Sequence, residues 1–143
     1  MSARARSIIA VVVGFLVIAV LAFGTDAIIR ATAPGVFGPT GRVESTRWLL
    51  LMQAYVFAFA VFGCWLAARL APDRPMRHAL ILGGLGLVFN VAGSAAMWDT
   101  APVWYHLLAI ALVMPAAWLG GRIRERQVAR GAGVRVVGAP TPA

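Results

Sequence analysis

Charged residues are scarce in this chain of 143 residues, and lysine is absent. Charged residues make up 13% of the sequence, and all 13 basic residues are arginines. A soluble domain is about 25% charged. With 61% hydrophobic residues and a mean hydropathy of +0.83, a water-soluble monomer would have to bury more apolar surface than so small a core can hold. The composition therefore excludes a soluble enzyme, a disordered chain and a free nucleic-acid-binding module.

Cysteine and histidine are also rare, which limits the chemistry available to the chain. The one cysteine, Cys64, cannot form an internal disulfide or the cysteine pair that quinone-linked thiol oxidation needs. Two histidines and one cysteine are too few for a metal site, and no metallopeptidase motif is present. Ser94 and His106 are the nearest approach to a nucleophile and base, but nothing orients them. We therefore expect no enzyme activity, no cofactor and no metal.

Four long apolar runs dominate the sequence. They cover about residues 7–29, 48–70, 76–98 and 102–122. About 20 residues at 1.5 Å each cross a 30 Å hydrocarbon core, and lipid offers no partner to unpaired backbone groups, so each run is expected to be a helix. The first run is longer than the apolar part of a signal peptide, which favours an uncleaved span over a cleaved leader. The predicted fold is an all-α membrane protein, with a four-transmembrane-helix bundle in one domain over residues 1–130.

The arginines predict the orientation of the chain. If both termini lie on the inner side, that side holds ten arginines and the outer side three. Cytoplasmic loops carry such an excess, so both termini are expected in the cytoplasm of a bacterial inner (plasma) membrane. Because the arginines flank the apolar runs, they do not predict a nucleic-acid partner. Residues 131–143 lack a helical period and are predicted to be a disordered cytoplasmic tail.

Two spans end in a shared pattern. Trp65-Leu-Ala-Ala-Arg69 and Trp118-Leu-Gly-Gly-Arg122 both read as tryptophan, leucine, two small residues and arginine. An internal repeat of two like-oriented helical hairpins would explain the shared pattern. The alternative is that any span that ends on the inner side can carry a tryptophan anchor followed by a basic stop signal. Tryptophan favours both membrane interfaces. The expected interface anchors are Trp48, Trp65, Trp98, Trp104 and Trp118.

The second half of the chain, about residues 71–122, carries further recognisable segments. These are Ala71-Pro-Asp-Arg-Pro-Met-Arg-His78, Ala96-Met-Trp-Asp99, Trp104-Tyr-His106 and Ala117-Trp-Leu-Gly-Gly-Arg122. In this pattern the chain resembles a group of small, uncharacterised bacterial four-span membrane proteins. The resemblance implies a four-span bacterial protein and lends no activity, ligand or functional residue.

Polar residues within membrane spans are the first candidates for function. Here the candidate polar cluster is Asp26, Gln53, Asn90 and His106. Asp26 is expected near the outer end of its span, either as a cation- or proton-binding carboxylate or in a pair with Arg30 one turn later. His106 either pairs with Asp26 or Asp99 or makes a single interfacial hydrogen bond. Asn90 and Gln53 are expected to form hydrogen bonds between helices.

The third span carries small residues on one face. Gly83, Gly86 and Gly93 are predicted to allow close helix packing, with Asn90 among them, and this span is expected to be surrounded by the others. A pore-lining role for the same face is the alternative. Beyond the fourth span, Arg122, Arg124 and Arg126 are predicted to meet anionic lipid headgroups or to act only as a stop signal.

Three classes of function remain to be weighed. A non-catalytic accessory or structural membrane component, bound to a membrane-protein partner or to copies of itself, agrees best with the small size and the lack of a catalytic set. The alternative is a small-molecule or proton-coupled transporter that acts as an oligomer. Dimeric four-helix exporters place an acid deep in the first span, whereas this span is apolar until Asp26. An intramembrane enzyme is the least supported class.

Overall fold

Four long helices make up nearly all of the computed structural model, which describes residues 2–137. They are α1 (Ala3–Thr32), α2 (Thr46–Leu70), α3 (Pro75–Ala96) and α4 (Val103–Val137). Two short 3-10 helices, η1 (Pro34–Val36) and η2 (Trp98–Thr100), lie in the connections. Each long helix contains a segment long and apolar enough to cross a membrane. The chain is therefore an all-α multi-pass membrane protein with a four-helix bundle, as the apolar runs predict.

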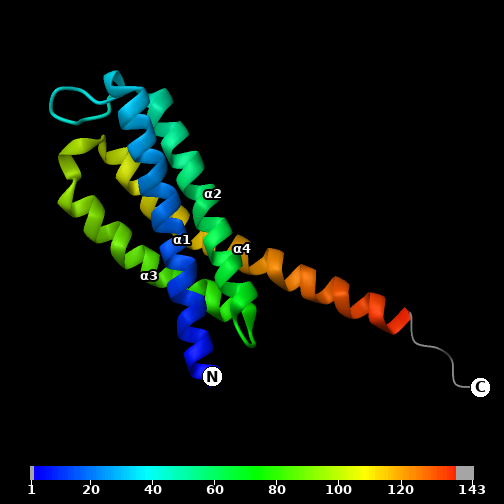
Figure 1. Ribbon diagram of the computed structural model, residues 1–143. Helices are drawn as coiled ribbons and strands as arrows, with labels where there is room; N and C mark the ends of the chain where they lie inside the picture. Colours follow the sequence, from blue (N-terminus) through cyan, green and yellow to red (C-terminus); the bar gives the residue numbers. More distant parts are fainter. Residues whose placement is uncertain (1, 138–143) are drawn as a thin grey trace, which may run out of the picture.

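The two ends of the bundle differ in their connections (Figure 1). One end, here called the loop end, carries the long α1–α2 connection, η2 and the start of α4. The opposite end, here called the turn end, carries the N-terminus and the short α2–α3 turn at residues 71–74. The hairpins α1–α2 and α3–α4 consequently run in the same direction.

Helix packing is uneven around the bundle. Each of the pairs α1–α2, α2–α4 and α3–α4 packs along an extensive contact, whereas α1 and α3 touch over a much shorter stretch. In Figure 1, α1 and α3 approach each other in the half near the turn end and separate towards the loop end. The prediction that the third span is surrounded by the others is therefore wrong, because α2 and α4 form the centre of the bundle.

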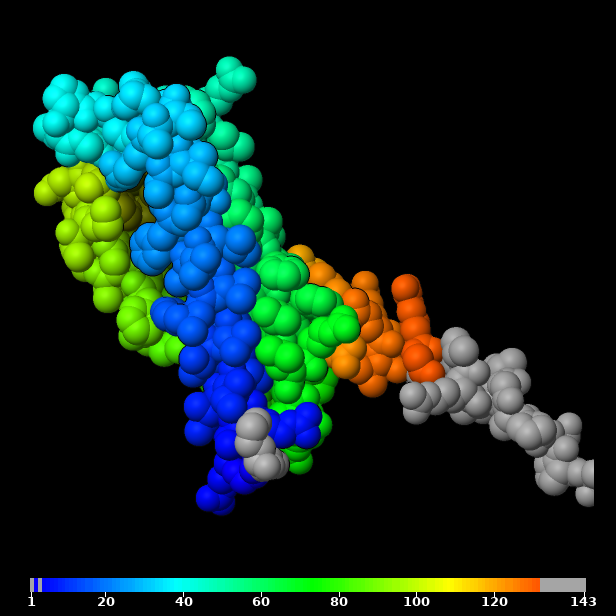
Figure 2. All heavy atoms as spheres, viewed as in Figure 1, coloured from blue at the N-terminus to red at the C-terminus, as the bar shows by residue number. Residues whose placement is uncertain are grey.

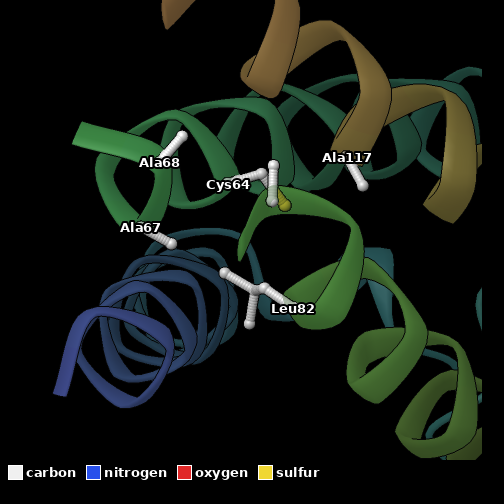
Figure 3. Close-up of a cluster of buried hydrophobic side chains, with 6 residues drawn as sticks. Cys64, Ala67, Ala68, Leu82 and Ala117 are labelled. Atoms are coloured by element: carbon white, nitrogen blue, oxygen red, sulfur yellow. The ribbon is translucent and has the colours of Figure 1, made fainter. Parts of the chain in front are cut away.

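Small side chains fill the core of the turn half. The buried cluster consists of Cys64, Ala67, Ala68, Ala79, Leu82 and Ala117. Figure 3 shows the cluster between the helices, with Leu82 reaching from α3 towards α1. Such small groups leave the backbones close together, which is how membrane helices gain dispersion contacts without a hydrophobic driving force.

Three glycines at two helix crossings make this close approach feasible. A Cβ on Gly14 of α1 would lie 2.8 Å from the Gly63 carbonyl oxygen of α2, and a Cβ on Gly63 would lie 2.9 Å from the Gly14 carbonyl oxygen. A Cβ on Gly120 of α4 would lie 2.6 Å from the Val61 carbonyl oxygen and 2.7 Å from the Trp65 nitrogen of α2. Backbone atoms cannot move aside as a flexible side chain can, so these crossings tolerate no side chain.

A second cluster closes the loop end. Val43, Leu49, Met52 and Ala101 are buried together. The loop is fastened to the α3–α4 connection by two hydrogen bonds, from the Val43 nitrogen to the Thr100 carbonyl (3.1 Å) and from Arg42 Nη1 to the Asp99 carbonyl (2.8 Å). The loop therefore ties the two hairpins together at this end.

The last helix is longer than the sequence predicts. It continues to Val137, so the predicted boundary of a disordered tail at residue 131 is wrong for residues 131–137. Arginine, glutamine and alanine are good helix formers and outweigh the cost of Gly131 and Gly133. The part beyond the bundle extends away from it (Figure 1), and Trp65 Nε1 donates a 3.0 Å hydrogen bond to Gln127 Oε1 where it leaves. Residues 138–143 of the predicted tail lie outside the described residues.

We expect Gly120→Ala to lower the free energy of unfolding by about 1–3 kcal/mol, because the added methyl group would meet the α2 backbone. The matched control is Gly84→Ala on α3, where a Cβ meets nothing within 4 Å. That variant should be neutral or should gain up to about 1 kcal/mol from its higher helix propensity. Reversible unfolding in mixed micelles, followed by circular dichroism, measures both, and equal stability of the two variants would contradict the crossing.

Candidate functional site

The bundle encloses a cavity between its two buried clusters. It has two adjoining parts. The polar chamber, of about 280 Å³, lies in the loop half and is lined by all four residues of the predicted polar cluster, Asp26, Gln53, Asn90 and His106. The apolar chamber, of about 480 Å³, lies deeper and is lined mainly by aliphatic and phenylalanine side chains. Gln53, Val56, Asn90 and Ala109 line both chambers, so the two parts meet at these residues.

The cavity lies where α1 and α3 separate. At the apolar chamber Phe15 of α1 and Phe89 of α3 still bridge the two helices, with ring centroids 5.1 Å apart, and both line this chamber. Figure 2 shows the surface hollowed between α1 and α3 towards the loop end. Because both helices face lipid on their outer sides, this opening connects the cavity with the bilayer.

Asp26 is the acidic residue of the polar chamber. The Tyr55 hydroxyl of α2 donates a hydrogen bond to Asp26 Oδ1. Within residues 2–137 the structure shows no ion pair to Asp26, and the predicted pairing with Arg30 is not formed. The Arg30 guanidinium instead lies 4.1 Å from the centre of the Phe37 ring. Arg30 also lines the chamber, so a carboxylate and a guanidinium face the same space without forming an ion pair with each other.

Asn90 and Gln53 lie at the junction of the two chambers. Asn90 Oδ1 is fully buried and is the one buried side-chain polar atom without a hydrogen-bond partner among the residues described. Gln53 is buried as well, with 6% of its surface exposed. The expected interhelical hydrogen bond of Asn90 Oδ1 is therefore absent. A buried acceptor without a donor is costly, and a bound group that donates a hydrogen bond would remove this cost.

His106 is held by its neighbours on one side of the polar chamber. Its ring stacks on Trp98 with centroids 5.1 Å apart and an interplanar angle of 14°, and Nε2 lies 3.2 Å from the Trp98 carbonyl oxygen. Since a carbonyl only accepts, Nε2 carries the proton and donates it. The structure thus shows the single interfacial hydrogen bond and neither of the pairings with Asp26 or Asp99.

The three glycines predicted to pack helices behave differently. A Cβ on Gly83 would collide with the Ala117 side chain, so Gly83 allows the close approach of α3 to α4. A Cβ on Gly86 would lie 3.6 Å from Val113 Cγ1, which is an ordinary contact. A Cβ on Gly93 would meet nothing within 4 Å, and this residue lines the polar chamber. The packing prediction is wrong for Gly93, because a methyl group there would face open space and not a neighbouring helix.

The tryptophans and the arginines beyond the bundle lie at its two ends. Trp48, Trp98 and Trp104 lie at the loop end, while Trp65 and Trp118 lie in the turn half. The cationic groups of Arg69 and Arg122 lie 5.3 Å and 5.6 Å from the rings of Trp65 and Trp118. On α4, Arg122 also forms a 3.4 Å ion pair with Glu125, while Arg124 and Arg126 form none in the described part of the chain.

Sequence reasoning missed Tyr55 and the glycines of α1, α2 and α4. Tyr55 lies one turn from the loop-end cluster, at the same level as Asp26 on the neighbouring helix. The antiparallel hairpin could have paired them, since Asp26 is the seventh residue from the end of α1 and Tyr55 is the tenth residue of α2. The glycines Gly14, Gly63 and Gly120 each lie four residues from an alanine in the same apolar run, and this small-residue spacing is the signal that could have found them.

The cavity offers hydrogen-bonding groups in its polar chamber and aliphatic and aromatic walls in its apolar chamber. No group of three or more metal-ligating side chains occurs among the residues that the structure describes. Cys64 lines the apolar chamber, and Ser94 and His106 line the polar chamber, where the His106 Nε2 proton is already donated to Trp98. Hydrogen-bonding groups at one end and apolar walls at the other are typical of a site for a small amphipathic molecule.

Comparisons of the chain with protein-family models, with curated proteins and with solved structures found no match. The fold and the cavity therefore carry the functional argument by themselves.

We expect Tyr55→Phe to lower the free energy of unfolding by about 1 kcal/mol, because it removes the hydrogen bond to Asp26 from a partly buried site. Tyr105→Phe is the matched control, since Tyr105 lines the polar chamber together with Asp26 and its hydroxyl has no hydrogen bond within the described residues. Unfolding in bicelles would measure both. A loss of stability in Tyr105→Phe equal to that in Tyr55→Phe would show that the Asp26 contact contributes nothing.

Proposed function

We propose that the chain is a non-catalytic accessory component of a bacterial inner membrane that binds a small amphipathic molecule in its cavity. The observation that supports this is the junction of a polar and an apolar chamber within one bundle. Ligand pockets of about 300–1,000 Å³ with apolar walls and a few convergent polar groups are typical of small-molecule sites.

The unused acceptors predict the head group of the ligand. Asp26 has no cationic partner, and Asn90 Oδ1 has no donor, in the part of the chain that the structure describes. Both line the polar chamber. A ligand with an ammonium group would pair with Asp26 and supply donors, whereas an anionic head would face the carboxylate directly. Arg30 would repel a cationic head group, but its guanidinium lies over the Phe37 ring and forms no ion pair with Asp26 in the described residues.

The apolar chamber predicts a flexible hydrocarbon chain on the ligand. Its walls include Phe15, Ile18 and Leu112, with Gln53 and Asn90 at the end nearer the polar chamber. The opening between α1 and α3 faces the lipid, so the ligand would enter sideways from the bilayer with its head towards the loop end (Figure 2). A lipophilic amine meets these requirements.

An accessory protein that only holds a ligand needs a partner to receive it. The apolar sides of α1 and α3 beside the opening are exposed, with Phe23 74% and Val88 66% accessible, and are available to lipid, to a membrane-protein partner or to a second copy. Native mass spectrometry of the gently extracted protein would separate these cases. A reproducible second protein would support the accessory role.

A transporter is the second candidate, and the asymmetry of the cavity favours it. The cavity opens in the loop half and is closed in the turn half by the cluster around Leu82 and Ala117. A cavity bounded at both ends is the form expected of the occluded state of an alternating-access protein, between its two open states. Transport would require a second state in which the contact of Gly83 with Ala117 opens.

The orientation proposed from the arginines is also testable. With Cys64 replaced by alanine, Ser45→Cys at the loop end should react with a membrane-impermeant maleimide in intact cells. Ser2→Cys near the N-terminus should react only after the cells are opened. Both residues are exposed, so their accessibility to the reagent reports the side of the membrane. The reverse labelling pattern would overturn the cytoplasmic placement of the termini.

Binding of amphiphiles with a common twelve-carbon chain tests the proposed ligand. We expect dodecylamine to bind the purified chain in nanodiscs, with dodecanol weaker and dodecanoate weakest. Asp26→Asn should weaken dodecylamine binding about tenfold and leave dodecanol unchanged, because only the charged head uses the carboxylate. Native mass spectrometry of the nanodisc complexes gives the occupancies.

A pair of alanine variants on α4 separates cavity binding from adsorption to the outside. Ala109 lines both chambers, whereas Ala111, two residues later, is exposed and lines neither. Ala109→Phe should abolish binding of all three amphiphiles, and Ala111→Phe should not change it. If both variants bind equally, the cavity is not the site. If Ala109→Phe abolishes binding but dodecylamine binds no better than dodecanol and dodecanoate, the cavity is the site and the proposed role of Asp26 is wrong.

A further inference from the structure

The turn end carries a separate pocket of about 330 Å³ that shares no residue with the cavity. It lies between the start of α1 and the α2–α3 turn with the start of α3, two regions that meet at this end of the bundle (Figure 1). The residues that line it include Arg4 and Ile8 of α1, Asp73 and Arg74 of the turn, and Arg77 and Ile81 of α3.

The pocket has an excess of positive charge. Arg4, Arg74 and Arg77 line it, against the single carboxylate of Asp73. None of the three arginines forms an ion pair in the structure of residues 2–137, where the one ion pair joins Arg122 and Glu125. Guanidinium groups are well suited to bind the oxygens of a phosphate. These three are brought together with no anionic partner of their own.

Two helix starts add to the positive potential. α1 begins at Ala3 and α3 begins at Pro75, so both helices have their N-terminal ends at this pocket. The partial positive charge at the N-terminal end of a helix favours an anion nearby. Arg74, directly before α3, has a φ of 42°, which is left-handed and unfavourable for a residue with a side chain. The fold therefore keeps an arginine here at a cost in backbone energy.

Apolar side chains continue from the charged pocket into the lipid-facing surface. Ile8 of α1 is 65% exposed and Ile81 of α3 is 48% exposed, and both line the pocket beside the arginines. His78 is buried at the same place, and its Nδ1 lies 3.3 Å from the Arg74 carbonyl oxygen. A ligand that fits this surface has an anionic head and hydrocarbon chains next to it.

From this arrangement we infer that the pocket at the turn end binds the phosphate headgroup of an anionic phospholipid. The arginines contact the phosphate oxygens, and the acyl chains follow α1 and α3 along Ile8 and Ile81. A free phosphate ion offers the same oxygens but has no chains to contact the isoleucines. The inference does not depend on the ligand of the cavity, because the two sites have no lining residue in common.

Lipid retention by the detergent-purified full chain tests this site. We expect native mass spectrometry to show phosphatidylglycerol retained in preference to phosphatidylcholine of the same chain length. The double variant Arg4→Gln/Arg77→Gln should weaken that retention about tenfold, since each basic residue near a lipid surface contributes appreciably to its binding. Arg77→Lys in the wild-type background keeps the charge and should retain most of the preference, which separates loss of charge from loss of folding.

The matched control is Arg6→Gln/Arg69→Gln, which removes the same charge from exposed residues at the same end of the bundle but outside the pocket. It should leave the preference for phosphatidylglycerol unchanged. Equal loss in both double variants would mean general attraction to a basic surface and would overturn the site. If inorganic phosphate displaces phosphatidylglycerol and the chain shows no preference between the two lipids, the pocket is a free-phosphate site and the lipid assignment is overturned.

Discussion

The close approach of helix backbones in the turn half is the constraint on which the rest of the structure depends. Gly14 against Gly63, and Gly120 against the α2 backbone, bring α1 and α4 to α2 at distances that no side chain would permit. Straight helices that touch at one level and cross at an angle must separate at another. α1 and α3 touch only over a short stretch and separate in the loop half, where the cavity lies.

The loop end limits how far the helices separate. Arg42 and Val43 bind the carbonyl groups of the α3–α4 connection, and the cluster around Leu49 and Met52 is buried beneath them. The cavity is thus bounded at both ends and remains open at the side, between α1 and α3. An opening of this kind favours a ligand from the bilayer over one from water, because a ligand that enters sideways keeps its hydrocarbon part in an apolar medium throughout.

Polar groups occupy two levels of the molecule, and their surroundings differ. In the polar chamber, Asp26 is held by Tyr55 and His106 by Trp98, so each has one fixed partner and remains in contact with the cavity. At the turn end, Arg4, Arg74 and Arg77 meet with little negative charge between them. The first level fits a ligand that donates hydrogen bonds, and the second fits an anion at the membrane surface.

The four helices and their like-oriented hairpins follow from the sequence, because spans of about 20 apolar residues admit only helices in lipid. Sequence reasoning also selected the polar cluster, since few polar residues occur in the spans and Asp26, Gln53, Asn90 and His106 all proved to line one chamber. It misjudged Gly93 and the end of α4, and it missed Tyr55. Where the helices touch and where they part emerged only from their packing in three dimensions. That arrangement depends on which glycine faces a neighbouring backbone. The hydrophobic pattern of the sequence does not show this, because the face of a span towards lipid and its face towards the other helices are both apolar.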